Sequence, residues 1–589
     1  MPTPSTPRLA ALPLWLAAML ACCAPTLLAY NAPPSATLLN QCVAVAGWGV
    51  FVIVLAPERL RRSAWPLLAA MAAVAAAAAA SWLAGDLPRS LSLSAIGLLA
   101  AAAVLAAAGA DAARRVDAPT VFAALSGGLL LAALGGVAVA LVQVFAPDWA
   151  DGQWIAASGL PGRAVGNLRQ PNHLCSLLLW GVVAAVALHE LGRLPRWALA
   201  ALVTLLVVGV ELTASRTGAV GLLLLLGWAL VDRRLSPAAR WTLAATPLLY
   251  GLAYAAMGWY GEFSHQALGA GARLDSSGLG DGGSRNGRLN IWRNAWALVL
   301  AHPWGGVGFG EFNIAWSLTP FAGRPTAFFD HTHNLPLQLA AELGLPLAIT
   351  VLALLGWALW RGLQRARHAT GEAATSGRAA LVLVLLTGLH SMVEYPLWYA
   401  YFLLPAALAW GWALGTPAGG AQAEATTSWV APASAGGALA GVLAGVVLAV
   451  GGTLAVADYR QVVVIYAPPE GGGSLASRIS RGQRSLLFAH HADYAAATND
   501  SPAEARALAF RRATHSLLDT RLMSAWAEDL HARGQQRLAR GLAARLREFD
   551  SADAAAFFAA CGTPAGRSDW RCQPVLPAPD WDEYVAAAR

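Results

Sequence analysis

The sequence predicts an all-α polytopic membrane protein with about 12–13 transmembrane helices, a large polar loop and a C-terminal soluble helical domain. Its 589 residues are 57% hydrophobic and only 12% charged, which is too little charge to cover a soluble protein of this length. Apolar runs over 67–83, 199–210 and 438–456 reach or approach the length that a helix needs to cross a bilayer. Beyond residue 457 the chain turns polar, and over Ser524–Arg547 leucines and alanines recur at helical spacing between arginines and glutamates.

The first apolar segment follows a short tail with one arginine and lacks a small-residue cleavage site, so we expect an uncleaved span rather than a signal peptide. A Gly/Ala/Pro/Ser/Thr-rich linker over 416–435 precedes the last span. The predicted spans lie near residues 11–30, 39–56, 64–84, 91–109, 119–145, 172–189, 197–213, 217–232, 241–259, 334–360, 379–394, 397–415 and 436–456.

Arginines in the short loops predict the orientation, because cytoplasmic loops of membrane proteins are enriched in basic residues. Five loops carry arginines and all fall on one side if the N-terminus is cytoplasmic. The arginines are Arg59, Arg61 and Arg62; Arg114 and Arg115; Arg193 and Arg196; Arg233, Arg234 and Arg240; and Arg361, Arg365, Arg367 and Arg378. Loops 146–171, 211–217, 260–333 and 390–397 and the region after 457 are then periplasmic.

Composition excludes several kinds of chemistry. All 40 basic residues are arginine, so neither a Schiff base nor a lysine general base is available. The net charge of +7 fits basic cytoplasmic loops and gives no reason to expect nucleic acid. The sequence has no glycine-rich phosphate loop, Rossmann fingerprint or zinc signature, which disfavours ATP-driven transport and predicts no metal site and no cofactor. Cys561 and Cys572 could form a disulfide if their region is periplasmic.

Polar residues gather at the predicted periplasmic ends of the spans. Each cluster alone has a structural explanation: Pro171 suits a first helical turn, Arg216 could reach lipid phosphates, and Tyr395 and Tyr399 resemble interfacial aromatics. Together they suit an anionic, lipid-linked substrate, since arginine binds diphosphate oxygens with paired hydrogen bonds and histidine can deprotonate a hydroxyl. The clusters are Gln170–His173, Ser215–Thr217, Ser284–Arg288, Phe328–Asn334 and His390–Tyr399.

These motifs resemble the bacterial O-antigen ligase superfamily over about residues 160–415, and the His390–Tyr399 motif with the soluble C-terminal region most resembles its protein O-oligosaccharyltransferase (PglL-type) branch. The resemblance implies a metal-independent glycosyltransferase of the bacterial inner membrane. The superfamily motif of a histidine, a following polar residue and a glycine further along the chain matches His333, Asn334 and Gly344. The implied catalytic residues are His333, Arg216 and Tyr395; the implied substrate-binding residues are Arg285, Arg288, Gln170, Asn172, His173, His331, Asn334, Glu394 and Tyr399.

Some alternatives stay open on the sequence. His331 could act in place of His333, and Tyr399 in place of Tyr395. The implied donor is an undecaprenyl-diphosphate-linked oligosaccharide and the implied acceptor a pilin-like periplasmic protein. An O-antigen ligase acting on lipid A-core and an O-antigen polymerase are alternatives, and a lipid-linked glycan transporter is a distant one, because transporters place polar residues near the bilayer midplane.

The sequence also predicts a division into four parts. Residues 1–159 are N-terminal transmembrane helices, and 160–415 form the ligase-like catalytic core with its loop 260–333. Residues 416–456 are the linker and last span, and 457–589 form the soluble, helical, periplasmic domain.

Overall fold

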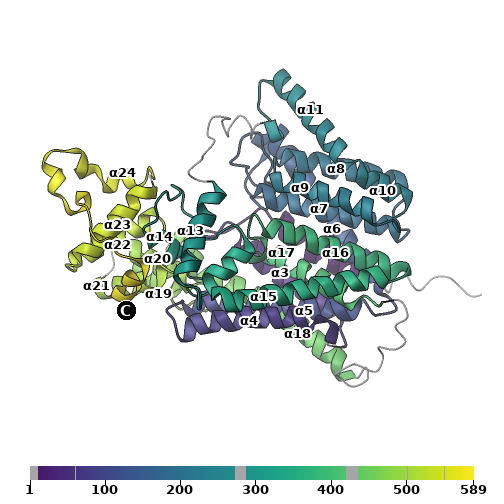
Figure 1. Ribbon diagram of the computed structural model, residues 1–589, viewed down its shortest axis with the longest axis horizontal. Helices are drawn as coiled ribbons and strands as arrows, with labels where there is room; N and C mark the ends of the chain where they lie inside the picture. The colour runs from purple at the N-terminus through teal and green to yellow at the C-terminus, as the bar shows by residue number, and fades with distance from the viewer. Residues whose placement is uncertain are drawn as a thin grey trace, which may run out of the picture. The chain divides into compact units, whose positions relative to one another are not determined.

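The computed structural model describes residues 11–59, 61–271, 287–418, 435–499, 502–549 and 551–588. Every regular element in these ranges is an α-helix or a short 3-10 helix (Figure 1), which confirms the predicted all-α class. Within the same ranges eight helices are long and apolar enough to cross a membrane, and three more are apolar but shorter. The chain is therefore a multi-pass membrane protein.

Every segment predicted to span the membrane is helical. The eight long apolar helices are α3 (Leu38–Leu55), α4 (Trp65–Leu83), α5 (Arg89–Ala112), α6 (Ala118–Phe145), α7 (Pro171–Glu190), α15 (Leu335–His368), α16 (Gly371–Ser391) and α18 (Ala435–Tyr466). The shorter ones are α2 (Leu12–Leu27), α9 (Arg216–Val231) and α17 (Ala400–Gly415). The two remaining predicted spans are α8 (Arg196–Leu212) and the pair α10 (Pro237–Ala244) and α11 (Thr246–Ser264).

Several of these spans differ in extent from the prediction: α15 ends at His368 rather than 360, and α16 begins at Gly371 rather than 379. The span expected at 241–259 begins at Pro237 and is interrupted at Ala245, because Pro247 has no amide hydrogen with which to continue the helix. α18 continues beyond the expected end at residue 456 to Tyr466. Apolar content therefore located the helices but not all of their ends.

Helix α15 is interrupted at Gly344, whose φ of 73° and ψ of 164° are not helical. The amides of Val307 and Gly308 donate to the carbonyls of Ala341 and Glu342 at 2.9 and 3.0 Å. The amide of Leu345 donates to the Pro303 carbonyl at 2.7 Å. The loop at 303–308 thus satisfies backbone groups that the break would leave unpaired.

The chain forms two compact units, and α4, α5, α15 and α18 contribute residues to both. Unit 1 comprises Met1–Met71, Ala100–Asp281 and Leu354–Val456, and unit 2 comprises Ala72–Leu99, Gly282–Ala353 and Ala457–Arg589. In unit 1, α7 packs against α6, α8, α9 and α16 (Figure 1). Because α7 has neighbours on all of these sides, it is central to its unit and 89% buried along its apolar length.

Unit 2 joins part of the large polar loop to the C-terminal region. The loop contains α13 (Arg288–Ala301) and α14 (Phe312–Leu318). Cys561 and Cys572 form the disulfide that the sequence allowed. The C-terminal region is helical, as predicted, with α19 (Leu475–Gly482), α20 (Ala489–Thr498), α21 (Ala503–Ala513), α22 (Thr520–Ala532), α23 (Gln536–Phe549), α24 (Ala554–Phe557) and α25 (Trp581–Ala588).

Candidate active site

Asn172 joins three of the sequence motifs in unit 1. Its side-chain amide nitrogen donates to Glu394 Oε1 at 3.0 Å, and its oxygen accepts from Ser215 Oγ at 2.6 Å. Asn172 lies in the first turn of α7, Ser215 caps α9, and Glu394 follows α16. The bundle therefore brings together residues that are far apart in the sequence, and Ser215, absent from the predicted site residues, is part of the arrangement.

The start of α7 is fixed by its own residues. Gln170 is the N-cap, and its Oε1 accepts the His173 amide hydrogen at 2.7 Å. Pro171 occupies the first helical position, where its missing amide hydrogen costs nothing. The residue before the cap, Arg169, adopts a left-handed φ of 56°. Gln170 thus has a clear structural role in ending the preceding loop.

Arg216 is the first residue of α9 and is exposed, whereas Ser215 and Thr217 on either side are buried. Ser215 Oγ accepts the Gly218 amide hydrogen at 3.2 Å, so it caps the helix that presents Arg216. Ala214 has a φ of 53°, which turns the chain sharply into this helix. An exposed guanidinium at a helix N-terminus is a favourable place for an anion.

His173 lies beneath an aromatic cluster rather than at the surface, with 4% of its area exposed. Its ring meets that of Tyr399 edge-on at a centroid distance of 4.5 Å, and its Nδ1 lies 3.3 Å from the Tyr401 hydroxyl. Tyr395 stacks on Tyr399 at 6.0 Å, and both tyrosines are half-buried. His173 therefore supports the tyrosines, and Tyr395 and Tyr399 are the members of the cluster that are partly exposed.

His333 occupies a constrained turn in unit 2, directly before α15. Its φ is 54°, a left-handed conformation that costs a non-glycine residue about 1–2 kcal/mol. Thr332 Oγ1 donates to the Asn334 carbonyl at 2.8 Å, and Asn334 Oδ1 caps α15 by accepting the Leu337 amide hydrogen at 3.0 Å. The imidazole is half-buried. The hydrogen bonds on both sides hold the histidine in its unfavourable conformation.

Two further contacts tie this turn to its surroundings. Gln338 accepts the Thr332 amide hydrogen at 2.8 Å and donates to Glu342 at 3.0 Å. Trp292 of α13 donates its indole hydrogen to the Thr332 carbonyl at 2.9 Å. Arg288, the first residue of α13, lies one helical turn before Trp292 and so on the same face of that helix. Arg285 lies outside the described residues.

Asp330 and His331 form a close pair, with 3.0 Å between Oδ1 and Nδ1. Loss of solvent raises the pKa of Asp330, but the charge and hydrogen bond of His331 outweigh it and lower that pKa to about 2. The carboxylate is therefore ionised at neutral pH.

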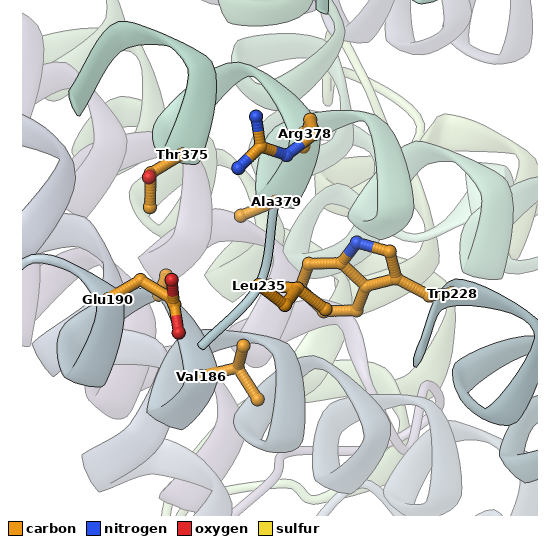
Figure 2. Close-up of a pocket in the computed structure, with 8 residues that line it drawn as sticks. Val186, Glu190, Trp228, Leu235, Thr375, Arg378 and Ala379 are labelled. Carbon is orange, nitrogen blue, oxygen red and sulfur yellow. The ribbon is translucent and has the colours of Figure 1, made fainter. Parts of the chain in front are cut away.

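Val186 and Glu190 of α7 line a small crevice (Figure 2), which lies at the opposite end of that helix from Gln170. Arg378, which lines the crevice, pairs with Asp232 at 2.6 Å. Because α7 is 20 residues long, its two ends are about 30 Å apart, so the crevice does not belong to the candidate site. Its lining residues include Val186, Glu190, Trp228, Leu235, Thr375, Arg378 and Ala379.

Three family models match the chain over the regions that contain these residues. A protein glycosylation ligase model matches residues 164–189, and an O-antigen ligase model matches 200–352. A model of the C-terminal part of virulence factor membrane-bound polymerases matches 378–559. Over these regions the chain is similar to the O-antigen ligase superfamily.

Within that superfamily the chain is most like the protein O-oligosaccharyltransferase (PglL-type) branch. It is 27% identical over 273 residues to a general O-oligosaccharyltransferase of Acinetobacter baylyi, covering 44% of this chain and 46% of the relative. It is 24% identical over 274 residues to a ComP-specific O-oligosaccharyltransferase of the same organism, covering 44% and 45%. The chain thus spans about half the length of the curated relatives it matches.

Proposed function

We propose that this protein transfers a preassembled oligosaccharide from a membrane-anchored undecaprenyl diphosphate to a hydroxyl group of a periplasmic protein. The observation that carries the proposal is the strained backbone of His333. Of the five non-glycine residues with positive φ in the described ranges, three lie in or next to a superfamily motif, each directly before the residue that caps a helix: Arg169, Ala214 and His333. Strain of this kind persists where surrounding contacts enforce it and is concentrated at functional sites.

In the proposed reaction His333 is the general base. It accepts the proton of the acceptor hydroxyl as the oxygen forms a bond to the anomeric carbon of the first sugar. The bond from that carbon to the diphosphate oxygen breaks, and the electron pair leaves with the diphosphate. A neutral imidazole suits this role. We assign it to His333 rather than His331, because His333 with Asn334 and Gly344 matches the spacing of the superfamily motif.

The arginines are proposed to hold the leaving diphosphate. Arg216 has the properties required, since its side chain is exposed at a capped helix start. Arg288, at the start of α13, is the second diphosphate ligand. Their guanidinium groups would neutralise charge that develops as the sugar–oxygen bond breaks, which lowers the barrier. Asn172 and Glu394 would act by fixing Ser215 and hence the direction of α9. Tyr395 and Tyr399 would stack on the sugar.

The periplasmic side is the proposed location of the reaction. Arginine asymmetry in the loops supports a cytoplasmic N-terminus and a periplasmic C-terminal region. The Cys561–Cys572 disulfide supports the same orientation, because disulfides persist in oxidising compartments such as the bacterial periplasm. Both observations favour an inner-membrane protein whose loop 260–333 and C-terminal helices face the periplasm.

A protein acceptor is preferred over lipid A-core because both relatives named above are O-oligosaccharyltransferases. Co-expression of the chain with a lipid-linked glycan pathway and a candidate pilin, in a host lacking its own O-antigen ligase, tests this choice. We expect glycan on the pilin. Glycan found on lipid A-core alone would refute the protein acceptor and favour the ligase, and chains of polymerised glycan would favour the polymerase.

The same co-expression system tests the proposed role of His333 as the general base. His333→Ala should abolish transfer, whereas His265→Ala should not, although His265 is a histidine with nearly the same φ of 55°. Arg216→Lys should reduce transfer because lysine cannot form paired hydrogen bonds to a diphosphate. Arg233→Lys, beyond the other end of α9, is the matched control. Normal transfer by the His333→Ala variant would overturn the mechanism.

A further inference from the structure

The C-terminal helices reach the segment that carries His333. Phe328 stacks on Phe549, the last residue of α23, with ring centroids 3.9 Å apart and ring planes 14° from parallel. Phe549 is 1% exposed, so this contact is part of a buried core and not a surface encounter. Five residues after Phe328 the chain arrives at His333. Helix α23 of the C-terminal region therefore packs against the segment that directly precedes His333, the proposed base.

A second set of contacts connects Phe549 to the imidazole ring of His333. Trp316 of α14 lies 6.0 Å from Phe549 and 5.8 Å from Phe329, between ring centroids. Phe329 in turn meets the His333 ring edge-on at 5.6 Å. We refer to Trp316, Phe328, Phe329 and Phe549 as the aromatic clamp. It connects the C-terminal domain to His333 through rigid side chains with few rotatable bonds.

Arg324 packs against two rings of the aromatic clamp, those of Trp316 and Phe549. Its guanidinium carbon lies 4.9 Å from the Trp316 ring centroid and 5.0 Å from that of Phe549. It also pairs with Glu548 of α23 at 3.0 Å and donates to the carbonyls of Trp316 and Thr319. The residue is 4% exposed. A buried arginine with all of these partners has essentially one position available, so α14 and α23 are fixed against each other.

We propose that the C-terminal domain is part of the catalytic unit, with Phe549 and Arg324 as positioning residues that set the place of His333. The inference rests on the proposed role of His333 as general base. A base must lie within hydrogen-bond reach of the proton it accepts, and a displacement of about 1 Å can lower a rate by about 100-fold. The turn at 332–334 fixes the backbone of His333, whereas the clamp restricts the ring through Phe329.

The test compares two substitutions of equally buried phenylalanines in the same domain. Phe549→Leu removes the flat ring that stacks on Phe328. Phe510→Leu removes a ring that is also 1% exposed but stacks on Trp526 within the C-terminal helices. Phe549→Tyr keeps the ring and serves as the conservative variant. Each full-length protein is assayed with undecaprenyl-diphosphate-linked oligosaccharide and the acceptor found by co-expression, and its thermal unfolding is measured.

We expect Phe549→Leu to lower kcat by about 10–100-fold with little change in the KM for the donor, because the base is misplaced while substrate binding persists. Phe549→Tyr should retain most of the activity. Phe510→Leu should lose stability to a similar degree yet keep its kcat. Amide hydrogen exchange over residues 328–334 should rise in Phe549→Leu and not in Phe510→Leu.

Equal kcat for Phe549→Leu and Phe510→Leu would overturn the positioning role, since both would then act only through stability. Loss of activity in Phe549→Tyr equal to that in Phe549→Leu would also overturn it, because the ring would not be what matters. The result for His333→Ala separates this inference from its premise. Full activity of that variant refutes the base, whereas an inactive His333→Ala with a fully active Phe549→Leu refutes the clamp alone.

Discussion

His333 combines a strained backbone with a proposed chemical role, so substitutions at this one position should separate stability from activity. With a φ of 54°, any residue with a Cβ is strained here by about 1–2 kcal/mol, and glycine is not. Glycine also makes the unfolded chain more flexible than alanine does, which offsets about 0.4–1 kcal/mol. His333→Gly should therefore be more stable than His333→Ala by about 1 kcal/mol.

The comparison of glycine with alanine isolates the strain, because neither residue carries an imidazole. For domains of about 150–250 residues, a change of 1 kcal/mol shifts the Tm by about 2–4 °C, which detergent-solubilised protein can reveal by thermal unfolding. Both variants should fail to transfer glycan. Equal Tm values would refute the account of backbone strain. Transfer by His333→Gly would instead refute the general base, even if its Tm rose as expected.

Three other substitutions test separate parts of the structure. Asn172→Ala removes one hydrogen bond from each of two buried partners, Ser215 and Glu394, and should lower the free energy of unfolding by about 1–3 kcal/mol. Denaturant unfolding in detergent measures this change, and no loss would refute the role of Asn172 as a junction. Gly344→Ala places a Cβ 2.4 Å from the Trp304 carbonyl oxygen and should be far more destabilising than Gly356→Ala on the same helix, where nothing lies within 4 Å. Similar melting temperatures of the two variants would refute the close approach of the loop to α15 at Gly344. Because the pKa of Asp330 is lowered to about 2, its stabilising effect is present above the unfolded pKa of about 3.9 and is lost as pH falls toward 2. Asp330→Asn should remove this dependence of stability on pH, and an unchanged acid transition would count against the pair with His331.

Hydropathy was sufficient to locate the membrane helices because a bilayer selects for length and apolar content, which a single sequence displays. The interruption of α15 was not predicted, since it depends on hydrogen bonds from the loop at 303–308. Gly344 and Pro346 are residue types that commonly interrupt helices, but neither identifies the loop that pairs with the break. Boundaries set by tertiary hydrogen bonds are not encoded in local composition.

The candidate site was predicted in pieces and not as an arrangement. The motifs identified Gln170, Asn172 and Glu394 individually, because polar residues at the ends of apolar segments are conspicuous. That Asn172 bonds to both Glu394 and Ser215 depends on the packing of α7, α9 and α16. Phe549 offered no signal at all, since an apolar residue at the end of an amphipathic helix is ordinarily a core residue.

The strained residues follow one structural rule that the motifs alone do not reveal. Each of Arg169, Ala214 and His333 directly precedes a residue whose side chain caps a helix: Gln170, Ser215 and Asn334, respectively. A left-handed residue before a cap turns the chain sharply, so that the helix begins abruptly.

Three such turns store about 3 kcal/mol or more, a substantial part of the 5–15 kcal/mol by which proteins are commonly stable. Glycine would relieve this strain at each position, and the chain has 58 glycines elsewhere. A side chain at each of these positions therefore carries a stability cost. At Ala214 the side chain is only a methyl, which has no chemistry of its own and can act only by limiting backbone freedom. We infer that restriction of the backbone before Ser215 and Arg216 is what that position contributes, whereas position 333 contributes both restriction and an imidazole.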